Sequence, residues 1–212
     1  KSALAHNLYQ VLIGEATIQE AVVASESGGY DVLPSNRELS GAEIDLVEME
    51  HRELQLKRAL SKVELQYDFV LIDCPPTLSL LTLNGLAAAH GVIIPMQCEY
   101  YALEGLSDLV DTLRRIRANL NSALRISGLL RTMYDPRNTL TLQVSEQLES
   151  HFSDKVYKTM IPRNVRLAEA PSHGIPAVVW DRASKGAQAY LSLAREVLSR
   201  SGLAPIPDPV SA

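Results

Sequence analysis

The chain has 212 residues, of which 46% are hydrophobic and 21% charged, as is usual for a globular protein with one large domain or two small ones. No apolar run approaches the roughly 20 residues of a membrane span. The two cysteines, Cys74 and Cys98, form no C-x-x-C pattern, so neither a zinc site nor a disulfide scaffold is indicated, and a reducing cytosol is the default compartment.

The net charge of -5 argues against a generally basic nucleic-acid binder, but the charge is unevenly distributed. Residues 1–110 carry 6 Lys and Arg against 16 Asp and Glu, whereas residues 111–212 carry 14 against 9. Two interpretations stay open, an anion-binding face in the C-terminal half and chance placement of solvated charges.

The first 66 residues show two capping-box patterns, Thr17 with Glu20 and Ser40 with Glu43. The second is expected to open one long, charge-rich amphipathic helix that continues to about Leu60. Between the two, residues 30–36 predict a short strand that ends at Pro34.

From residue 67 onward, short apolar runs alternate with amphipathic stretches. The pattern predicts strands at 69–73, 91–95, 125–130 and 155–162, and helices near 79–89, 104–119, 139–152 and 184–200. Uniformly apolar strands separated by helices are typical of a parallel sheet covered on both faces. The predicted fold is therefore a three-layer, doubly wound α/β domain over residues 1–200, followed by a Pro-rich irregular tail at 201–212.

In doubly wound sheets, ligands bind beyond the carboxyl ends of the strands. Four short segments follow successive predicted strands, namely Asp73, residues 95–97, residues 133–135 and residues 162–164. We therefore expect them to share one rim of the sheet.

Asp73 ends an apolar run and precedes Pro75 and Pro76. A carboxylate in this position can face a bound Mg²⁺, usually through water, because Mg²⁺ keeps much of its hydration shell. The alternative is a structural role, as a turn residue or a helix N-cap, since the two prolines prevent the strand from simply continuing.

Four motifs occur in a fixed order: "YDFVLIDCPPTLSLLTLNGL", "VIIPMQCEYYALEGL", "TMYDPRNTLTLQV" and "IPRNVRLAEAPSHGIPAVVWDRASKGAQAYLSLAREV". Together with the upstream "YDVLPSNREL", they resemble the ParA/Soj family of chromosome- and plasmid-partitioning ATPases over essentially residues 5–200. Members of that family are P-loop ATPases that bind Mg-ATP, dimerise around it, coat DNA without sequence preference and hydrolyse ATP in response to a ParB partner.

The resemblance implies roles for individual residues. Asp73 matches the Walker B aspartate, the magnesium-side and catalytic carboxylate, and residues 74–77 match the switch loop behind it. The residues that match the surroundings of the adenine are Met133, Pro162, Arg163 and Asn164. Positions that match DNA-binding residues of the chromosomal branch are Arg137 and Arg166, and Lys185 is added as a further basic candidate.

The charge count supports the DNA assignment independently. Residues 155–185 contain six Lys and Arg and two acidic residues, Glu169 and Asp181. Phosphate contacts need basic groups but no base-reading geometry, so scattered cations suit non-specific DNA binding. The alternative is that some of these arginines pair with surface acids, and for Lys155 that alternative is favoured.

The chain departs from the family pattern in one respect. It contains no Gly-Lys dipeptide, and hence no loop of the G-x-x-x-x-G-K-[ST] type. Residues 1–212 alone are therefore expected to lack ATPase activity. The fold is also expected to lack its N-terminal strands. Either an N-terminal segment with the loop precedes these residues, which is the favoured explanation, or the protein is a nucleotide-free relative.

Three functions compete. The favoured one is an ATP-driven partitioning switch with ATP, Mg²⁺, a ParB-like protein and non-specific DNA as ligands, active as a homodimer in the bacterial cytoplasm on the nucleoid. The second is a P-loop-less pseudo-ATPase that binds DNA or ParB. The third, a membrane-associated division regulator of the MinD type, needs an amphipathic C-terminal helix, where this chain has prolines.

Overall fold

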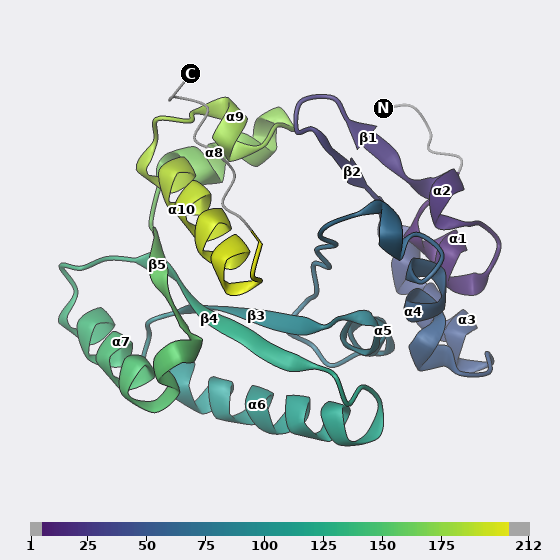
Figure 1. Ribbon diagram of the computed structural model, residues 1–212, viewed down its shortest axis with the longest axis horizontal. Coiled ribbons are helices and arrows are strands. Elements are labelled where there is room, and N and C mark those ends of the chain that lie inside the picture. The colour runs from purple at the N-terminus through teal and green to yellow at the C-terminus, as the bar shows by residue number, and fades with distance from the viewer. Residues whose placement is uncertain (1–5, 204–212) are drawn as a thin grey trace. The chain divides into compact units, whose positions relative to one another are not determined.

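The computed structural model describes residues 6–203, which form two compact units (Figure 1). The first unit comprises the described residues up to Val92 together with Thr112–Arg125. The second comprises Ile93–Asp111 and the described residues from Ile126 onward. Most of the predicted tail, residues 204–212, lies outside the described residues.

The first unit consists of short helices and one β-hairpin. Its elements are α1 (Leu8–Ile13), α2 (Ile18–Ala21), β1 (Val23–Ser25), β2 (Tyr30–Val32), α3 (Ala42–Val47), α4 (Gln55–Leu60) and α5 (Leu80–Ala88), with 3-10 turns η1 (Arg37–Ser40), η2 (Arg52–Leu54) and η3 (Glu64–Gln66). The strand predicted near residue 30 is present, and it pairs with β1 in an antiparallel hairpin. The capping box of Thr17 and Glu20 is confirmed at the start of α2.

The core of this unit has two apolar clusters. Val11 and Ile18 pack with Ala21 and Val63 in the first. In the second, Leu12, Ala42, Leu46 and Leu56 pack together, and partly buried residues of α5 complete the cluster. The amphipathic faces of α1, α3, α4 and α5 are thus used against one another.

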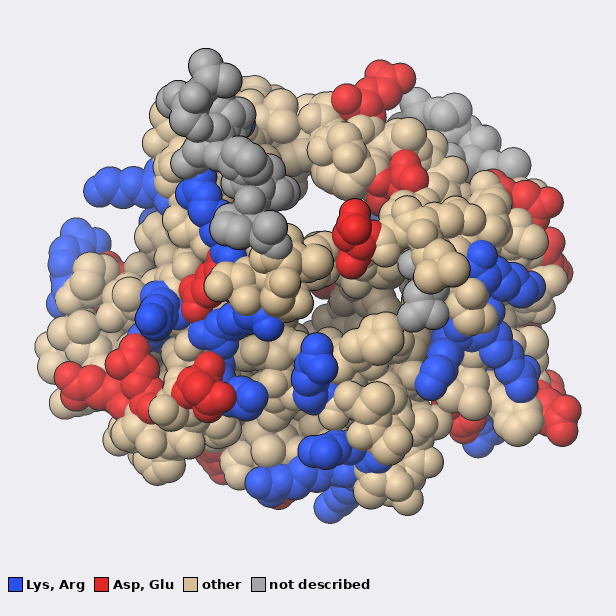
Figure 2. Space-filling model, viewed as in Figure 1, with Lys and Arg blue, Asp and Glu red and all other residues tan. Residues whose placement is uncertain are grey.

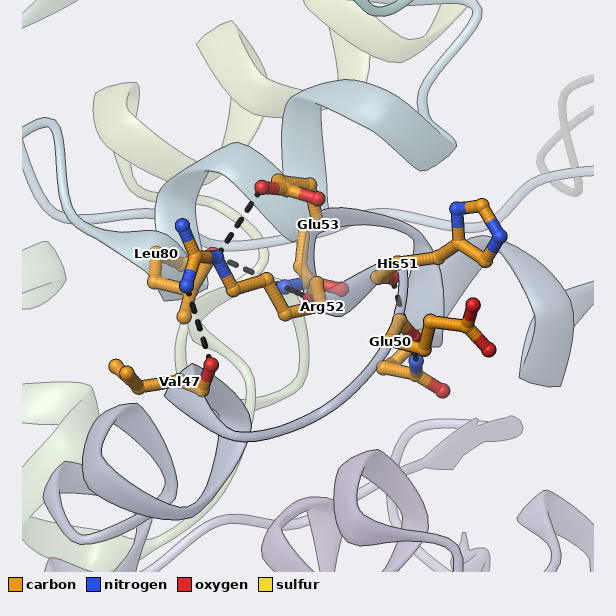
Figure 3. Close-up of polar contacts among 8 residues, drawn as sticks. Val47, Glu50, His51, Arg52, Glu53 and Leu80 are labelled. Carbon is orange, nitrogen blue, oxygen red and sulfur yellow. Dashed lines mark hydrogen bonds and ion pairs between the residues drawn. The ribbon is translucent and has the colours of Figure 1, made fainter.

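The long helix predicted after Ser40 is wrong, because the chain breaks at His51. His51 adopts a left-handed conformation with φ of 54°, and Ser40 donates to the Arg37 carbonyl instead of capping α3. Figure 3 shows the polar contacts that hold the break: Arg52 Nη1 donates to the Val47 carbonyl at 3.1 Å. Hydrogen bonds from side chains thus satisfy backbone carbonyls that would accept backbone hydrogen bonds in a continuous helix.

The strand predicted at 69–73 is also wrong. These residues belong to no strand, and Phe69, Val70 and Leu71 are 42%, 48% and 87% exposed. An apolar run becomes a strand only when a neighbouring strand accepts its backbone hydrogen bonds. Among the described residues no such neighbour lies beside this segment.

The second unit is built around a three-stranded sheet with the strand order β3-β4-β5. Its strands are β3 (Gly91–Gln97), β4 (Arg125–Tyr134) and β5 (Val156–Pro162); its helices are α7 (Thr139–Phe152), α8 (Val165–His173), α9 (Ala177–Trp180) and α10 (Lys185–Arg200), with a 3-10 turn η4 (Ser153–Lys155). Strands β4 and β5 are parallel, which confirms the predicted fold class. Helix α6 (Ala102–Asn119) begins in the second unit and ends in the first.

Helix α10 packs along β5 (Figure 1). Leu130, Tyr157 and Ile161 form the buried cluster, and Leu193 and Val197 of α10 pack against it. The helix thereby covers one side of the sheet and holds the end of β5 in place. The loop after β5 consequently starts from a fixed position.

Candidate functional site

A cavity of about 310 Å³ lies where the three strands of the second unit end. Its wall contains the last residue of β3, a residue near the end of β4, the residue after β5 and the first turn of α7; the lining residues are Gln97, Cys98, Glu99, Met133, Asp135, Asn138, Leu140, Thr141 and Arg163. The volume falls at the lower end of the range for small-ligand sites. The position is the one in which doubly wound sheets bind ligands.

The prediction of a shared rim agrees with the structure for three of its four segments. Gln97, Met133 with Asp135, and Arg163 come from residues 95–97, 133–135 and 162–164, and all line the cavity. The fourth, Asp73, belongs to the first unit. The carboxyl ends of parallel strands bring together residues that are up to 66 positions apart in the sequence, from Gln97 to Arg163.

Met133 lies in a local irregularity of β4. Between the pairs Arg131–Met160 and Tyr134–Pro162, β4 has one residue more than β5, so the strand is bulged. Met133 has φ of 51°, a left-handed conformation that is unfavourable for a residue with a side chain. The Thr132 hydroxyl donates to the Met96 carbonyl at 3.3 Å and ties the bulge to β3.

The polar wall is dominated by Asp135. Its carboxylate accepts two hydrogen bonds from the Arg137 guanidinium, at 2.9 and 2.8 Å, and one from the Arg137 backbone N–H at 3.1 Å. These bonds lower the pKa of Asp135 to about 2, with a smaller contribution from the charge of Arg163. The cavity wall therefore carries a permanent negative charge near one cation that lines the cavity, Arg163.

A buried cation lies behind the thiol of the cavity. Arg131 is 3% exposed and donates to the Ser145 hydroxyl, to the Glu149 carboxylate and to the Tyr157 carbonyl. Burial raises the pKa of the Cys98 thiol, and the charge of Arg131 opposes the increase. Cys98 consequently stays protonated and presents a small, soft surface to the cavity.

The four residues predicted to surround an adenine fall into two groups. Met133 and Arg163 line the cavity, whereas Pro162 and Asn164 are not among its lining residues. The Asn164 side chain caps α8 by accepting from the Leu167 N–H at 3.3 Å. Its position is thus explained by the start of a helix that the sequence did not predict.

The lining of the cavity combines apolar and hydrogen-bonding groups. Met133, Cys98 and Leu140 supply apolar or soft surface, and Gln97, Asn138 and Arg163 supply hydrogen-bonding groups. Nothing in this cavity would hold the phosphates by the backbone cradle of a glycine-rich loop.

Asp73 lies in an exposed irregular segment between the 3-10 turn η3 and α5. Ser79, not Asp73, is the N-cap of α5, since its side chain accepts from the Thr82 N–H. The N-cap interpretation of Asp73 is therefore excluded, whereas the magnesium interpretation stays a prediction.

Among residues 6–203, no three His, Cys, Asp or Glu side chains lie close enough to hold a metal ion by themselves. A single carboxylate is compatible with Mg²⁺ that is held mainly by phosphate oxygens and water.

The candidate DNA-binding arginines are exposed but paired. Arg137 is 88% exposed and bound to Asp135, while Arg166, which is 53% exposed, lies 2.8 Å from Glu169 and 3.3 Å from Asp181. These carboxylates raise the pKa of both guanidiniums. The pairs agree with the alternative drawn from the sequence, that some of these arginines pair with surface acids. The i,i+3 spacing of Arg166 and Glu169 is typical of such a pair.

Lys185 opens α10 and is exposed, and no described residue forms an ion pair with it. Lys155 lies 3.5 Å from Asp154, as expected from the interpretation that it pairs with a surface acid. Of the cations named here, Arg137, Arg166 and Lys155 therefore lie beside a carboxylate, whereas Lys185 does not.

The parallel sheet, with its cavity at the carboxyl ends of the strands, places the protein in the class of α/β proteins with a P-loop NTPase-like fold. A family model described as "AAA domain" matches residues 1–126. The sporulation initiation inhibitor protein Soj of Bacillus subtilis is 52% identical over 190 residues, which cover 90% of this chain and 75% of that protein. The chromosome partitioning protein ParA of Caulobacter vibrioides is 50% identical over 195 residues, covering 91% and 73%.

A solved structure, cobyrinic acid a,c-diamide synthase from Mycobacterium smegmatis with bound ATP analog and magnesium, is similar over 97% of this chain and 77% of that chain, with a TM-score of 0.79 and 36% identity. The chain belongs to the ParA/Soj family of partitioning ATPases. Within the described residues, every helix is too short or too polar to cross a membrane.

Proposed function

We propose that the complete protein is an ATP-driven partitioning switch. It binds Mg-ATP, dimerises around the nucleotide, binds DNA without sequence preference, and responds to a ParB-like partner during segregation of a chromosome or plasmid in the bacterial cytoplasm, on the nucleoid. Membership of the ParA/Soj family supports this proposal. So does the bound ATP analog and magnesium of a protein with a similar fold.

The observation that carries the proposal is the cavity at the ends of β3, β4 and β5. Its size and its mixed lining suit the adenine, with Met133 against one face of the base and Arg163 as a polar contact. Asp73 would act from the magnesium side, as a water-mediated ligand and catalytic carboxylate. Pro162 and Asn164 would act indirectly, because they fix the backbone on both sides of Arg163.

DNA binding would use Arg137, Arg166 and Lys185 as phosphate contacts. All three are exposed, and such contacts require charge and reach but no base-specific geometry. Because the two arginines already have carboxylate partners, a phosphate must displace or share those partners.

The nucleotide site is tested by Arg163→Ala in the full chain, with Lys158→Ala as the control. Lys158 is an exposed residue of β5 and does not line the cavity. Loss of a hydrogen bond to the bound base is expected to weaken binding of a fluorescent ATP analogue by about tenfold. Equal weakening in both variants, or in neither, would contradict the placement of the base.

Catalysis and DNA binding are tested separately. Asp73→Asn should abolish Mg²⁺-dependent hydrolysis by the full chain. Arg166→Gln should weaken duplex DNA binding and leave nucleotide binding unchanged, whereas Lys155→Gln should change neither. A full chain that binds DNA but never hydrolyses ATP would favour the pseudo-ATPase alternative.

A further inference from the structure

Two polar side chains of the cavity have hydrogen-bonding capacity that the described protein does not use. Asp135, which directly follows β4, and Thr141, in the first turn of α7, both line the cavity. Neither belongs to the four residues that the family resemblance assigns to the surroundings of the adenine. Both are therefore available to a molecule that occupies the cavity.

The Asp135 carboxylate keeps an acceptor position for a ligand. Its Oδ1 accepts from the backbone N–H and the Nε of Arg137, whereas its Oδ2 accepts, among the described residues, only from Arg137 Nη2 at 2.8 Å. A carboxylate oxygen can accept about two hydrogen bonds, so Oδ2 has room for one further donor. Because the pKa of Asp135 is about 2, the carboxyl stays ionised near neutral pH and acts only as an acceptor.

The orientation of this acceptor is fixed. The guanidinium of Arg137 holds both oxygens of Asp135, and the Arg137 backbone adds a third bond. The residue before Asp135 is also tied to the next strand, since the Arg163 N–H donates to the Tyr134 carbonyl at 3.4 Å. An acceptor that is held in place loses little entropy when a ligand binds.

Thr141 presents a hydroxyl without a partner. The residue is 7% exposed, and no described residue forms a hydrogen bond with its hydroxyl. Among residues 6–203, the side-chain polar atoms that are both fully buried and unpartnered are His6 Nδ1 and Arg131 Nε, so the Thr141 hydroxyl is open to the cavity. Asn138 already caps the helix by accepting from the Leu140 N–H at 3.0 Å. The Thr141 hydroxyl is thus free to donate to a ligand.

The identity of the base follows from these two groups. At the position where adenine carries its exocyclic amine, guanine carries a carbonyl oxygen. An ionised carboxylate accepts from the amine but repels the carbonyl oxygen. In Figure 2, red and blue side chains are interspersed over the face on which Figure 1 draws α7 and α10, so charge of one sign does not dominate that face. Individual contacts in the cavity must therefore distinguish the bases.

Given the nucleotide site of the proposed function, on which this step rests, we propose that Asp135 is the residue that selects adenine. Its carboxylate accepts from the exocyclic amine, and the Thr141 hydroxyl donates to a ring nitrogen beside that amine. A guanine base in the same orientation would place its carbonyl oxygen against a fixed negative charge. The cavity would consequently bind adenine nucleotides and reject guanine nucleotides.

The test compares Asp135→Asn with Glu99→Gln in the full chain. Glu99 is an exposed acid that lines the same cavity, so the control removes an equal charge and leaves the pair of Asp135 with Arg137 intact. Binding of fluorescent ATP and GTP analogues is measured for each protein. The unmodified protein should prefer the ATP analogue, and Asp135→Asn should lower this preference by about tenfold, because an amide can turn its N–H toward the carbonyl of guanine. Glu99→Gln should keep the preference.

The role of Thr141 is tested by Thr141→Val, which keeps the shape of the side chain and removes the hydroxyl. Binding of the ATP analogue should weaken by about fivefold. The control is Thr139→Val, since Thr139 lies in the same turn of α7 but is exposed and does not line the cavity. It should bind as the unmodified protein does.

The outcomes separate this proposal from the proposed function. A reduced preference in Asp135→Asn alone supports the selective role, and a ratio of two affinities is unaffected by a partial loss of folded protein. Equal binding of both analogues by the unmodified protein, an unchanged preference in Asp135→Asn, or an equal loss in Glu99→Gln overturns that role; weakened ATP binding by Arg163→Ala would then leave the proposed nucleotide site intact. Unweakened binding by Thr141→Val overturns the role of Thr141. Absence of nucleotide binding by the unmodified protein would overturn the proposed function as well.

Discussion

Asp135 and Arg137 form a closed pair in which one carboxylate accepts three hydrogen bonds from a single residue, two from its guanidinium and one from its backbone. Asp135 lines the cavity proposed for the nucleotide base, and Arg137 is a candidate phosphate contact for DNA. The proposed nucleotide base would therefore lie beside the carboxylate of this ion pair, and the proposed DNA would contact its guanidinium.

The pair can be measured by titration. The pKa of Asp135 lies at about 2, mainly because the side chain and then the backbone of Arg137 donate to the carboxylate. In Arg137→Gln, the pKa of Asp135 is expected to move toward its ordinary value of 3.8, as followed by NMR of the side-chain carboxyl. Because the folded pKa is lowered, the pair stabilises the fold above about pH 4, and this contribution is lost as the pH falls toward 2.

The control for this titration is Lys158→Gln, which removes an exposed charge outside the pair. It should leave the pKa of Asp135 at about 2. A pKa of Asp135 that stays low in Arg137→Gln would mean that Arg163 supplies the stabilisation instead.

Helices with a clear local period could be predicted from the sequence. The predicted bounds of 139–152 and 184–200 agree with α7 and α10 to within a residue. Both helices have an apolar stripe and a polar N-cap residue at their start, Asn138 for α7 and Ser184 for α10, so the signals that define them are local in the sequence. The parallel order of the strands also placed the residues of the cavity wall at one rim.

The errors involve distant partners. The break at His51 depends on Asn84, which lies more than 25 residues away along the chain, so the local pattern of 41–60 gave no sign of it. Residues 69–73 have the composition of a strand, but pairing is a property of two segments. Similarly, helix α8 contains Pro171 and was not predicted, although Asn164 begins it with an ordinary cap.

Gly85 of α5 leaves room for a sulfur atom. A Cβ added at this position would lie 2.9 Å from Cys74 Sγ and 3.4 Å from Ile72 Cγ2. Replacement of a helical glycine by alanine usually stabilises by about 1 kcal/mol, but here overpacking is expected to reverse the sign and cost about 1–3 kcal/mol. Urea denaturation of Gly85→Ala measures the difference.

Gly105→Ala is the matched control, since Gly105 also lies within a helix and a Cβ there would meet no atom within 4 Å. This control should be neutral or stabilising. Cys74→Ala combined with Gly85→Ala should recover most of the loss. A Gly85→Ala variant as stable as the unmodified protein would show that the segment with Cys74 moves freely.

Glu196 of α10 binds the backbone of β5. Its carboxylate accepts from the N–H groups of Lys158 and Thr159, at 2.8 and 2.9 Å, and from Arg200 at 2.8 Å. Burial opposes ionisation of the carboxyl, but these hydrogen bonds outweigh it and hold the pKa of Glu196 below its ordinary value of 4.5. Glu196→Gln is expected to lower the free energy of unfolding at pH 7 by about 1–3 kcal/mol.

The effect of Glu196→Gln should depend on pH in a defined direction. Because the folded pKa is lowered, the charged form stabilises the protein fully above about pH 4.5, and the contribution is lost at lower pH. The stability difference between the two proteins should therefore shrink in acid. Glu146→Gln, an exposed change on α7, should show no such difference, and a pH-independent loss in Glu196→Gln would point to packing instead of charge.

Asn84 joins α5 to the break that replaces the predicted long helix. The side chain is 1% exposed; its amide donates to the Arg52 carbonyl at 2.8 Å and to the Leu80 carbonyl at 3.0 Å, and its oxygen accepts from the Leu56 N–H at 3.1 Å. Asn84→Leu keeps a similar volume but leaves the partly buried carbonyl of Arg52 and the buried N–H of Leu56 without their partner. Because each such group costs about 1–3 kcal/mol, the variant should unfold at much lower urea concentration.

Hydrogen exchange shows where that loss occurs. In Asn84→Leu, the amide of Leu56 should exchange faster by a factor that exceeds the change in global stability, since its acceptor is gone. The amides of β4 and β5 should change only as much as the free energy of unfolding. A uniform change at all amides would mean that Asn84 contributes to the stability of the fold but does not hold the turn at His51.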